Sequence, residues 1–229
     1  RDLVRSRGLG DVYKRQVLHR HSNRLYKGHA PYMKNVIVIS GHPDLSVSRV
    51  NTAIMSKISH RGVKVHSLAS AVTPTGFDIH AEQALLDAHD RIVLLFPLYW
   101  YSCPAIMKQW IDEVFTPGYA YARGGDKLKN KEFMIITTVG APSTGYRAGG
   151  FNRYTLDELL RPLQQTVAYV KGIYLPVVGI YESVFIDDES IDVTARNVAE
   201  QVIEDQASAD QLYENMLLQA EQAQIALLQ

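Results

Sequence analysis

The chain has a single cysteine, no long apolar run and no net charge. Among its 229 residues only Cys103 carries a thiol, which excludes an internal disulfide and fits a reducing cytosol. No apolar run approaches the roughly 18–20 residues needed to cross a bilayer. Hydrophobic residues make up 46% of the chain, and 24 basic side chains balance 24 acidic ones. We therefore expect one cytoplasmic globular domain with a full core and no nucleic-acid partner.

The first 32 residues differ from the rest. They carry eight Lys or Arg against two acids and show no sustained apolar period. The run Arg7–Gln16 resembles translated adapter sequence, and Met33 looks like a natural start. We interpret residues 1–32 as a non-native or disordered extension. A nucleic-acid-binding arm is the functional alternative, whereas Asp2, Asp11 and the weak amphipathicity argue against a mitochondrial transit peptide.

From Met33 onward, strand and helix patterns alternate. Short apolar runs predict five buried strands, at residues 36–40, 63–68, 92–96, 133–139 and 174–180. Apolar spacing predicts helices from Val47 to Gly62 and at 79–89, 106–114, 156–170 and 192–203, with a further one at 210–228. Five βα units predict an α/β domain at residues 33–205, with a three-layer, doubly wound parallel sheet. Residues 206–229 are then a C-terminal helical tail.

The turn after the first strand is rich in hydrogen-bond donors. It runs from Ser40 to Asn51 and enters a helix, whose N-terminus favours a phosphate. It lacks the Gly-Lys-Ser/Thr ending of a P-loop and the G-x-G-x-x-G fingerprint of dinucleotide folds. A mononucleotide monophosphate held without a metal fits this turn. The alternative is that Ser48 only caps the helix.

The loop after the third strand is the most unusual feature. It displays Tyr99, Trp100 and Tyr101 in a row, and large apolar rings are costly to leave in water. A flat aromatic ligand such as a flavin ring would cover them. The loop at 137–142 has small residues that let a ring approach the backbone. Because all three loops follow strand ends, they should meet at the carboxyl edge of the sheet and form a flavodoxin-like FMN site.

These motifs resemble the flavodoxin-like NAD(P)H:quinone oxidoreductases. The resemblance covers about 33–203 and is nearest to the ancillary flavoproteins of glutathione-regulated potassium efflux systems. It is carried by Gly41-His42-Pro43 with Ser48 and Asn51, by Pro97-Leu98-Tyr99-Trp100-Tyr101-Ser102, by Lys108–Phe115, by Gly118-Tyr119-Ala120-Tyr121 with Gly124-Gly125, and by Thr137-Thr138. It implies a flavodoxin-like fold with strand order 2-1-3-4-5.

The resemblance also implies roles for individual residues. The cofactor-binding residues it implies are His42, Ser48, Arg49, Val50 and Asn51 for the FMN phosphate, Pro97, Leu98, Tyr99 and Trp100 for one edge of the ring, and Thr137, Thr138, Val139 and Gly140 for its pyrimidine side. Tyr119 and Tyr121 would line the substrate space across a homodimer interface, or simply pack, and Tyr121 is a candidate catalytic residue together with Tyr146. The resemblance also implies a tyrosine and a histidine that stabilise the reduced flavin. Tyr146 is the candidate for the tyrosine, and residues 145–169 contain no histidine for the second role. One departure is Val139-Gly140-Ala141, where the family often has two glycines.

Other chemistry-bearing residues have plainer interpretations. We expect Cys103 to be structural rather than reactive and Trp110 to belong to the core. The histidines show no metal-ligand spacing, so no metal is predicted. The acids Asp187-Asp188-Glu189 are expected to be a solvated turn and helix start rather than a cation site.

The implied activity is FMN-dependent transfer of a hydride from NADPH or NADH to a quinone or similar acceptor, in two steps. The alternative is a regulatory ancillary subunit of a membrane potassium efflux antiporter, placed at the inner face of the membrane. An electron-transfer flavodoxin is the third possibility, disfavoured because flavodoxins are usually strongly acidic and lack the segment 118–125.

Overall fold

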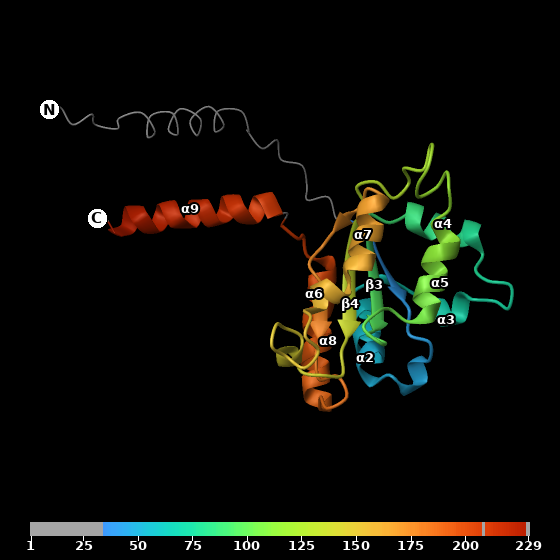
Figure 1. Ribbon diagram of the computed structural model, residues 1–229, viewed down its shortest axis with the longest axis horizontal. Helices are drawn as coiled ribbons and strands as arrows, with labels where there is room; N and C mark the ends of the chain where they lie inside the picture. The colour runs from blue at the N-terminus through green and yellow to red at the C-terminus, as the bar shows by residue number, and fades with distance from the viewer. Residues whose placement is uncertain (1–33, 208, 228–229) are drawn as a thin grey trace. The chain divides into compact units, whose positions relative to one another are not determined.

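The structure is a computed structural model that describes residues 34–207 and 209–227. The extension predicted at residues 1–32 lies outside the described residues. Within the described part, strands and helices alternate along the chain, from blue to red in Figure 1.

One parallel sheet forms the centre of the domain. Its strands are β1 (Val36–Ser40), β2 (Lys64–Ser67), β3 (Arg91–Pro97), β4 (Glu132–Thr138), β5 (Ile173–Tyr174) and β6 (Val178–Ile180). The order is β2-β1-β3-β4-β5, and β6 also pairs with β4. Every residue of β1 and β3 is buried, as the continuous apolar runs predicted for strands covered on both faces. The flavodoxin-like order 2-1-3-4-5 is therefore confirmed.

The fifth predicted strand, at residues 174–180, is broken in two. Its first part pairs Ile173 with Glu132, and its second part pairs Val178 with Ile136. Pro176 lies between the two parts, and a proline has no N–H to donate to the ladder. The strand therefore leaves β4 after Tyr174 and rejoins it at Val178.

Helices cover both faces of the sheet. They are α2 (Arg49–His60), α3 (Leu68–Ala71), α4 (Ile79–Asp87), α5 (Ala105–Val114), α6 (Leu156–Leu159), α7 (Arg161–Tyr169), α8 (Asp188–Ile203) and α9 (Ala209–Leu227), with 3-10 turns η1 (Leu45–Val47) and η2 (Ser143–Gly145). Apolar side chains of α2 and α8 pack on one face, and those of α3 to α7 pack on the other. This is the predicted three-layer arrangement. Trp110 lies fully buried between the sheet and the helices α3 to α7, as expected.

Several helices differ from the prediction, and α2 begins at Arg49 rather than Val47. Residues 156–170 form two helices, because the chain turns at Leu160 before Pro162 enters the first turn of α7. Helix α8 starts at Asp188 rather than Asp192, since the Asp187 carboxylate accepts a hydrogen bond from the Ser190 amide at 2.8 Å. The acidic run is thus a helix start. The short helix α3 was not predicted.

A buried arginine anchors the amino edge of the sheet. Arg91 is 0% exposed, and its Nε donates to Glu132 at 2.7 Å. Its Nη1 donates to the carbonyls of Val202 and Glu204, both at 2.7 Å. Lys34 adds a second cation to Glu132 at 2.8 Å. The C-terminal end of α8 is therefore fixed to the first residues of β3 and β4.

We expect Arg91→Met to lower the free energy of unfolding by about 3–5 kcal/mol, measured by urea denaturation. The substitution keeps much of the side-chain volume but leaves the buried Val202 carbonyl and the partly buried Glu204 carbonyl without their donor, and it removes one cation from Glu132. As a control, Arg61→Met removes the exposed pair with Glu200 and should cost less than about 1 kcal/mol. Equal losses in the two variants would contradict this account of the amino edge.

Helix α9 follows α8 after a short connection. Most of its described side chains are exposed, among them Leu212, Tyr213 and Met216. Over the described ranges, the helices are all too short or too polar to pass through a lipid bilayer.

Candidate functional site

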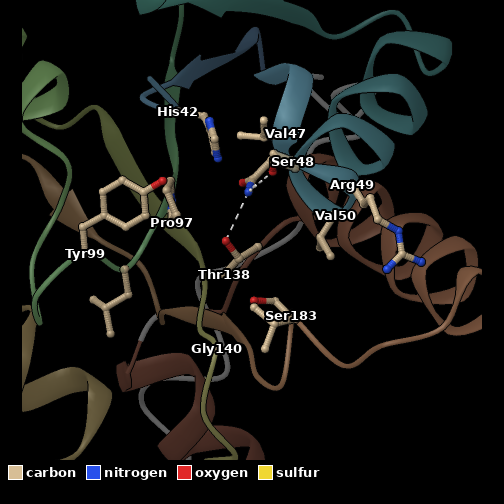
Figure 2. A pocket seen from close by; sticks show the side chains of 13 residues that line it. His42, Val47, Ser48, Arg49, Val50, Pro97, Tyr99, Thr138, Gly140 and Ser183 are labelled. Carbon is tan, nitrogen blue, oxygen red and sulfur yellow. Dashed lines mark hydrogen bonds between the residues drawn. The ribbon is translucent and has the colours of Figure 1, made fainter. Parts of the chain in front are cut away.

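A cavity of about 460 Å³ opens at the carboxyl edge of the sheet. This volume is within the range of small-molecule and cofactor sites. Figure 2 shows the side chains around it, which come from the first turn of α2, from the last residues of β3 and β4, and from the loops after β1, β3, β4 and β6. They are His42, Val47, Ser48, Arg49, Val50, Asn51, Pro97, Leu98, Tyr99, Thr138, Gly140, Ser183 and Val184. The convergence predicted for the first three loops is thus observed.

The first loop places His42 on the cavity wall as a neutral donor. The Asp44 amide donates to His42 Nδ1 at 3.1 Å, so the neutral ring carries its proton on Nε2. Burial lowers the pKa of His42 below its ordinary value, and the opposing effect of Asp44 is smaller. At neutral pH, His42 therefore offers an uncharged N–H. The loop lies tight against α5, because a Cβ on Gly41 would come within 2.7 Å of the Met107 methyl.

The N-terminus of α2 has free donors. Ser48 is the N-cap residue, but its side chain makes no capping hydrogen bond, so the alternative of Ser48 as a plain helix cap is wrong. No acidic residue lies in the first turn to occupy the unpaired amides. Unpaired N–H groups and the helix dipole together favour an anion at this end of the cavity.

Asn51 joins this helix to the end of β4. Its Nδ2 donates to Ser48 Oγ at 2.9 Å and to Thr138 Oγ1 at 3.1 Å. Because both hydroxyl oxygens accept from the amide, each keeps its own proton for a further acceptor. Asn51 is 2% exposed, and its Oδ1 has no hydrogen-bond partner among the described residues. A buried acceptor of this kind needs a donor, which a ligand with hydroxyl groups supplies.

The loop after β3 is a tight turn under backbone strain. Tyr99 and Ser102 exchange two backbone hydrogen bonds of 2.9 and 3.0 Å. Between them, Trp100 has a φ of 46° and Tyr101 a φ of 64°, a left-handed conformation that favours glycine. Tyr99 lines the cavity edge-on to His42, with ring centroids 6.4 Å apart. Trp100 lies outside the lining and is 93% exposed.

The loop after β4 contributes less lining than expected. Thr138 and Gly140 face the cavity, whereas Thr137 and Val139 are fully buried and do not line it. Thr137 keeps a buried hydroxyl without a partner among the described residues. Ten of the thirteen predicted cofactor residues therefore line one cavity, and Trp100, Thr137 and Val139 lie beside it.

The two candidate catalytic tyrosines lie outside the lining. Tyr146 packs on Tyr181, with ring centroids 5.8 Å apart, and burial raises its pKa, so it stays a protonated phenol at neutral pH. Tyr121 packs on Tyr169 at the opposite, amino edge, because α5 carries the chain away from the cavity. Within one chain the structure does not bring Tyr121 to the site. Tyr119 is buried there, its hydroxyl donating to Asp87 at 3.1 Å.

Three lining residues were not predicted: Val47, Ser183 and Val184. Val47 was assigned to a helix stripe, but η1 exposes it. Ser183 and Val184 belong to the loop after β6, and the pairing of Ile180 with Thr138 brings that loop to the carboxyl edge. The rule that ligands bind beyond the carboxyl ends of strands applies to this loop too and could have indicated it. Its residue types, however, are not typical of a ligand-binding loop.

Cys103 lies between the turn after β3 and helix α5, outside the residues that line the cavity. It is half-buried, and burial raises the pKa of its thiol, which disfavours the reactive thiolate. The interpretation of Cys103 as structural is supported. Across the described ranges, no three His, Cys, Asp or Glu side chains gather in a way that could hold a metal ion.

Comparisons with known proteins find the same fold. A family model described as flavodoxin-like fold matches residues 34–203. Among curated proteins, the Bacillus subtilis uncharacterized NAD(P)H oxidoreductase YdeQ is 39% identical over 172 residues, covering 75% of this chain and 87% of its own. The glutathione-regulated potassium-efflux system ancillary protein KefG of Cronobacter sakazakii is 40% identical over 147 residues, covering 64% of this chain and 80% of its own.

Solved structures share the fold. An NADPH-quinone reductase from P. pentosaceus is 29% identical with a TM-score of 0.67, covering 76% of this chain and 99% of its own. General stress protein 14 from Treponema denticola, in complex with FMN, is 31% identical with a TM-score of 0.66, covering 73% of this chain and 95% of its own. A structure described as a tryptophan halogenase from Streptomycin violaceusniger is 35% identical with a TM-score of 0.71, covering 75% and 99%. Since the described activities differ, function has to be argued from the site.

Proposed function

The chain belongs to the family of proteins with the flavodoxin-like fold, and from that premise we propose that it is an FMN-dependent NAD(P)H oxidoreductase that reduces a quinone or similar flat acceptor. The main support for this proposal is the cavity at the carboxyl edge of the sheet. One end offers the free amides of α2 to an anion, and the other is bounded by Pro97, Leu98 and Tyr99 and by the small residue Gly140.

The residues present fit FMN on the polar side of the cavity. The amides of Arg49 to Asn51, His42 Nε2 and the Ser48 hydroxyl are all uncharged donors suited to a phosphate. The buried Asn51 Oδ1, which has no partner in the described chain, suits a hydroxyl of the ribityl group. A metal is not needed to hold the phosphate at such a helix N-terminus.

The other side of the cavity suits the isoalloxazine ring. When bound, FMN supplies the redox chemistry, taking a hydride from NAD(P)H and passing electrons to the acceptor. The chain holds the ring in place through the backbone of Pro97 to Tyr99 and of Thr138 to Gly140. Tyr146, whose pKa is raised by burial, remains a neutral hydrogen-bond donor near this end of the sheet. We propose a homodimer, in which Tyr121 reaches the site of a second copy.

A second candidate function rests on the likeness to KefG, whose printed name is that of an ancillary protein of a glutathione-regulated potassium-efflux system. We propose, as the alternative, that the chain is a cytoplasmic regulatory subunit that docks on a membrane potassium efflux antiporter. Capture of the antiporter's cytosolic domain by the purified chain would support this role. Turnover of a quinone by the isolated chain would support the enzyme. The two results are compatible.

We expect the purified chain to carry, or to take up, one FMN and to show a two-band visible flavin spectrum. Anaerobic NADPH or NADH should bleach the spectrum, and a quinone should restore it. The measurement is absorbance before and after each addition. A chain that stays colourless after incubation with FMN would contradict the proposed function.

A further inference from the structure

The loop after β6, residues 181–187, forms a fourth wall of the cavity. Ser183 and Val184 line the same cavity as Ser48 and Val50, and Figure 2 shows Ser183 across the cavity from His42. Ser183 is half-buried, and its hydroxyl makes no hydrogen bond to another described residue. It therefore has a proton available for a ligand.

The backbone of this loop is held firmly in place. The Ser183 amide donates to the Val139 carbonyl at 3.0 Å, and the Glu182 amide donates to Ala141 at 3.2 Å. Glu182 has a φ of 56°, a left-handed conformation that a glutamate adopts at a cost of about 1 kcal/mol or more. The strain turns the chain so that the next residue lies along the cavity wall.

Arg49 contacts the loop from the other side through an exposed ion pair. Its Nη2 donates to Asp188 Oδ1 at 2.5 Å, and its Nη1 donates to the Ile186 carbonyl at 3.4 Å. The guanidinium therefore points away from the cavity, as Figure 2 shows, although its backbone amide belongs to the first turn of α2. These bonds couple the end of the loop to the helix N-terminus that we assign to the phosphate.

We propose that Ser183 donates a hydrogen bond to the phosphate of FMN and that Arg49 is a positioning residue that holds Ser183 in place through residues 186–188. The inference rests on the proposed function, since it concerns the same cavity. A phosphate is an acceptor-only group with several oxygens, and the amides of α2 approach it from one side. Ser183 supplies a donor from the opposite wall, and its free hydroxyl requires no other bond to break.

The test is the affinity of the flavin-free full chain for FMN and for riboflavin, measured by quenching of flavin fluorescence. Riboflavin has the same ring and ribityl chain but no phosphate. We expect Ser183→Ala to weaken FMN about 10-fold, as for one hydrogen bond to a charged group, and riboflavin less than about 2-fold. Ser183→Thr, which keeps the hydroxyl, should bind FMN within about 3-fold of the unchanged chain.

Ser59→Ala is the matched control, because Ser59 is exposed at the far end of α2 and should not change either affinity. Unchanged FMN affinity in Ser183→Ala would overturn the inference, and so would an equal loss for riboflavin. A chain that binds no FMN before any substitution would instead overturn the proposed function.

The positioning role of Arg49 has its own readout. We expect Arg49→Met to weaken FMN about 3-fold in the unchanged chain and to have no further effect in the Ser183→Ala background. Additive losses in the double variant would overturn a role that acts through Ser183.

Discussion

Ser48→Asp is expected to make the folded chain more stable and at the same time to prevent tight FMN binding. Ser48 occupies the N-cap of α2 without capping it, and aspartate is among the best N-cap residues. We expect a gain of about 0.5–1 kcal/mol in the free energy of unfolding, measured by urea denaturation. The same carboxylate takes the amides that the phosphate needs and repels its charge, so the Kd for FMN should rise about 100-fold or more.

Two controls separate charge from shape in this experiment. Ser48→Asn also caps the helix but is neutral, so it should be as stabilising and should weaken FMN by only about 10-fold. Riboflavin, which carries no phosphate, should bind nearly as well to Ser48→Asp as to the unchanged chain. FMN binding that survives Ser48→Asp would show that the phosphate does not lie at α2.

The centre of the sheet was predictable because its strands are buried on both faces. In β1, β3 and β4 the apolar runs favour a central parallel strand, and the structure places these strands within one residue of the predicted positions. Their carboxyl ends deliver three of the four loops that line the cavity. The positions of these strands can therefore be predicted even where the bounds of the helices between them are ambiguous.

The parts that were missed depend on tertiary pairing. Pro176 marks where the fifth strand breaks, but the return of β6 to β4 is set by which neighbour each residue meets. That return carries Ser183 into the site, although no local pattern marks it. Helix α8 likewise begins early because Asp187 caps it, and a run of acids alone does not distinguish a helix start from a solvated turn.

Tyr121 shows a different limit of sequence reasoning. The resemblance assigns it to the substrate space, but the topology sends residues 118–125 to the amino edge, away from this chain's own cavity. Chain order cannot tell whether such a residue serves its own site or that of a second copy. The tyrosine's role in catalysis remains a prediction that depends on the proposed dimer.

Trp100→Gly is expected to leave stability unchanged or to raise it by up to about 1 kcal/mol, while quinone turnover falls about 10-fold or more. Trp100 is 93% exposed, so its ring contributes little packing, and its φ of 46° is costly for any residue but glycine. Glycine relieves that strain, which raises the free energy of unfolding. Part of this gain is lost because glycine also gives the unfolded chain more conformational entropy. The measurements are urea denaturation and NADPH-dependent reduction of a quinone.

Trp100→Ala separates the ring from the strain, since alanine removes the ring and keeps an unfavourable φ. It should lose turnover as Trp100→Gly does, without the relief of strain. Tyr213→Ala, which removes an exposed ring on α9, should leave turnover unchanged. The Trp100 indole is exposed on a strained turn next to Tyr99, which lines the cavity, so packing within the chain does not account for it. Full turnover in both Trp100 variants would therefore contradict the assignment of the Trp100 ring to the flavin site, while leaving the proposed enzyme itself intact.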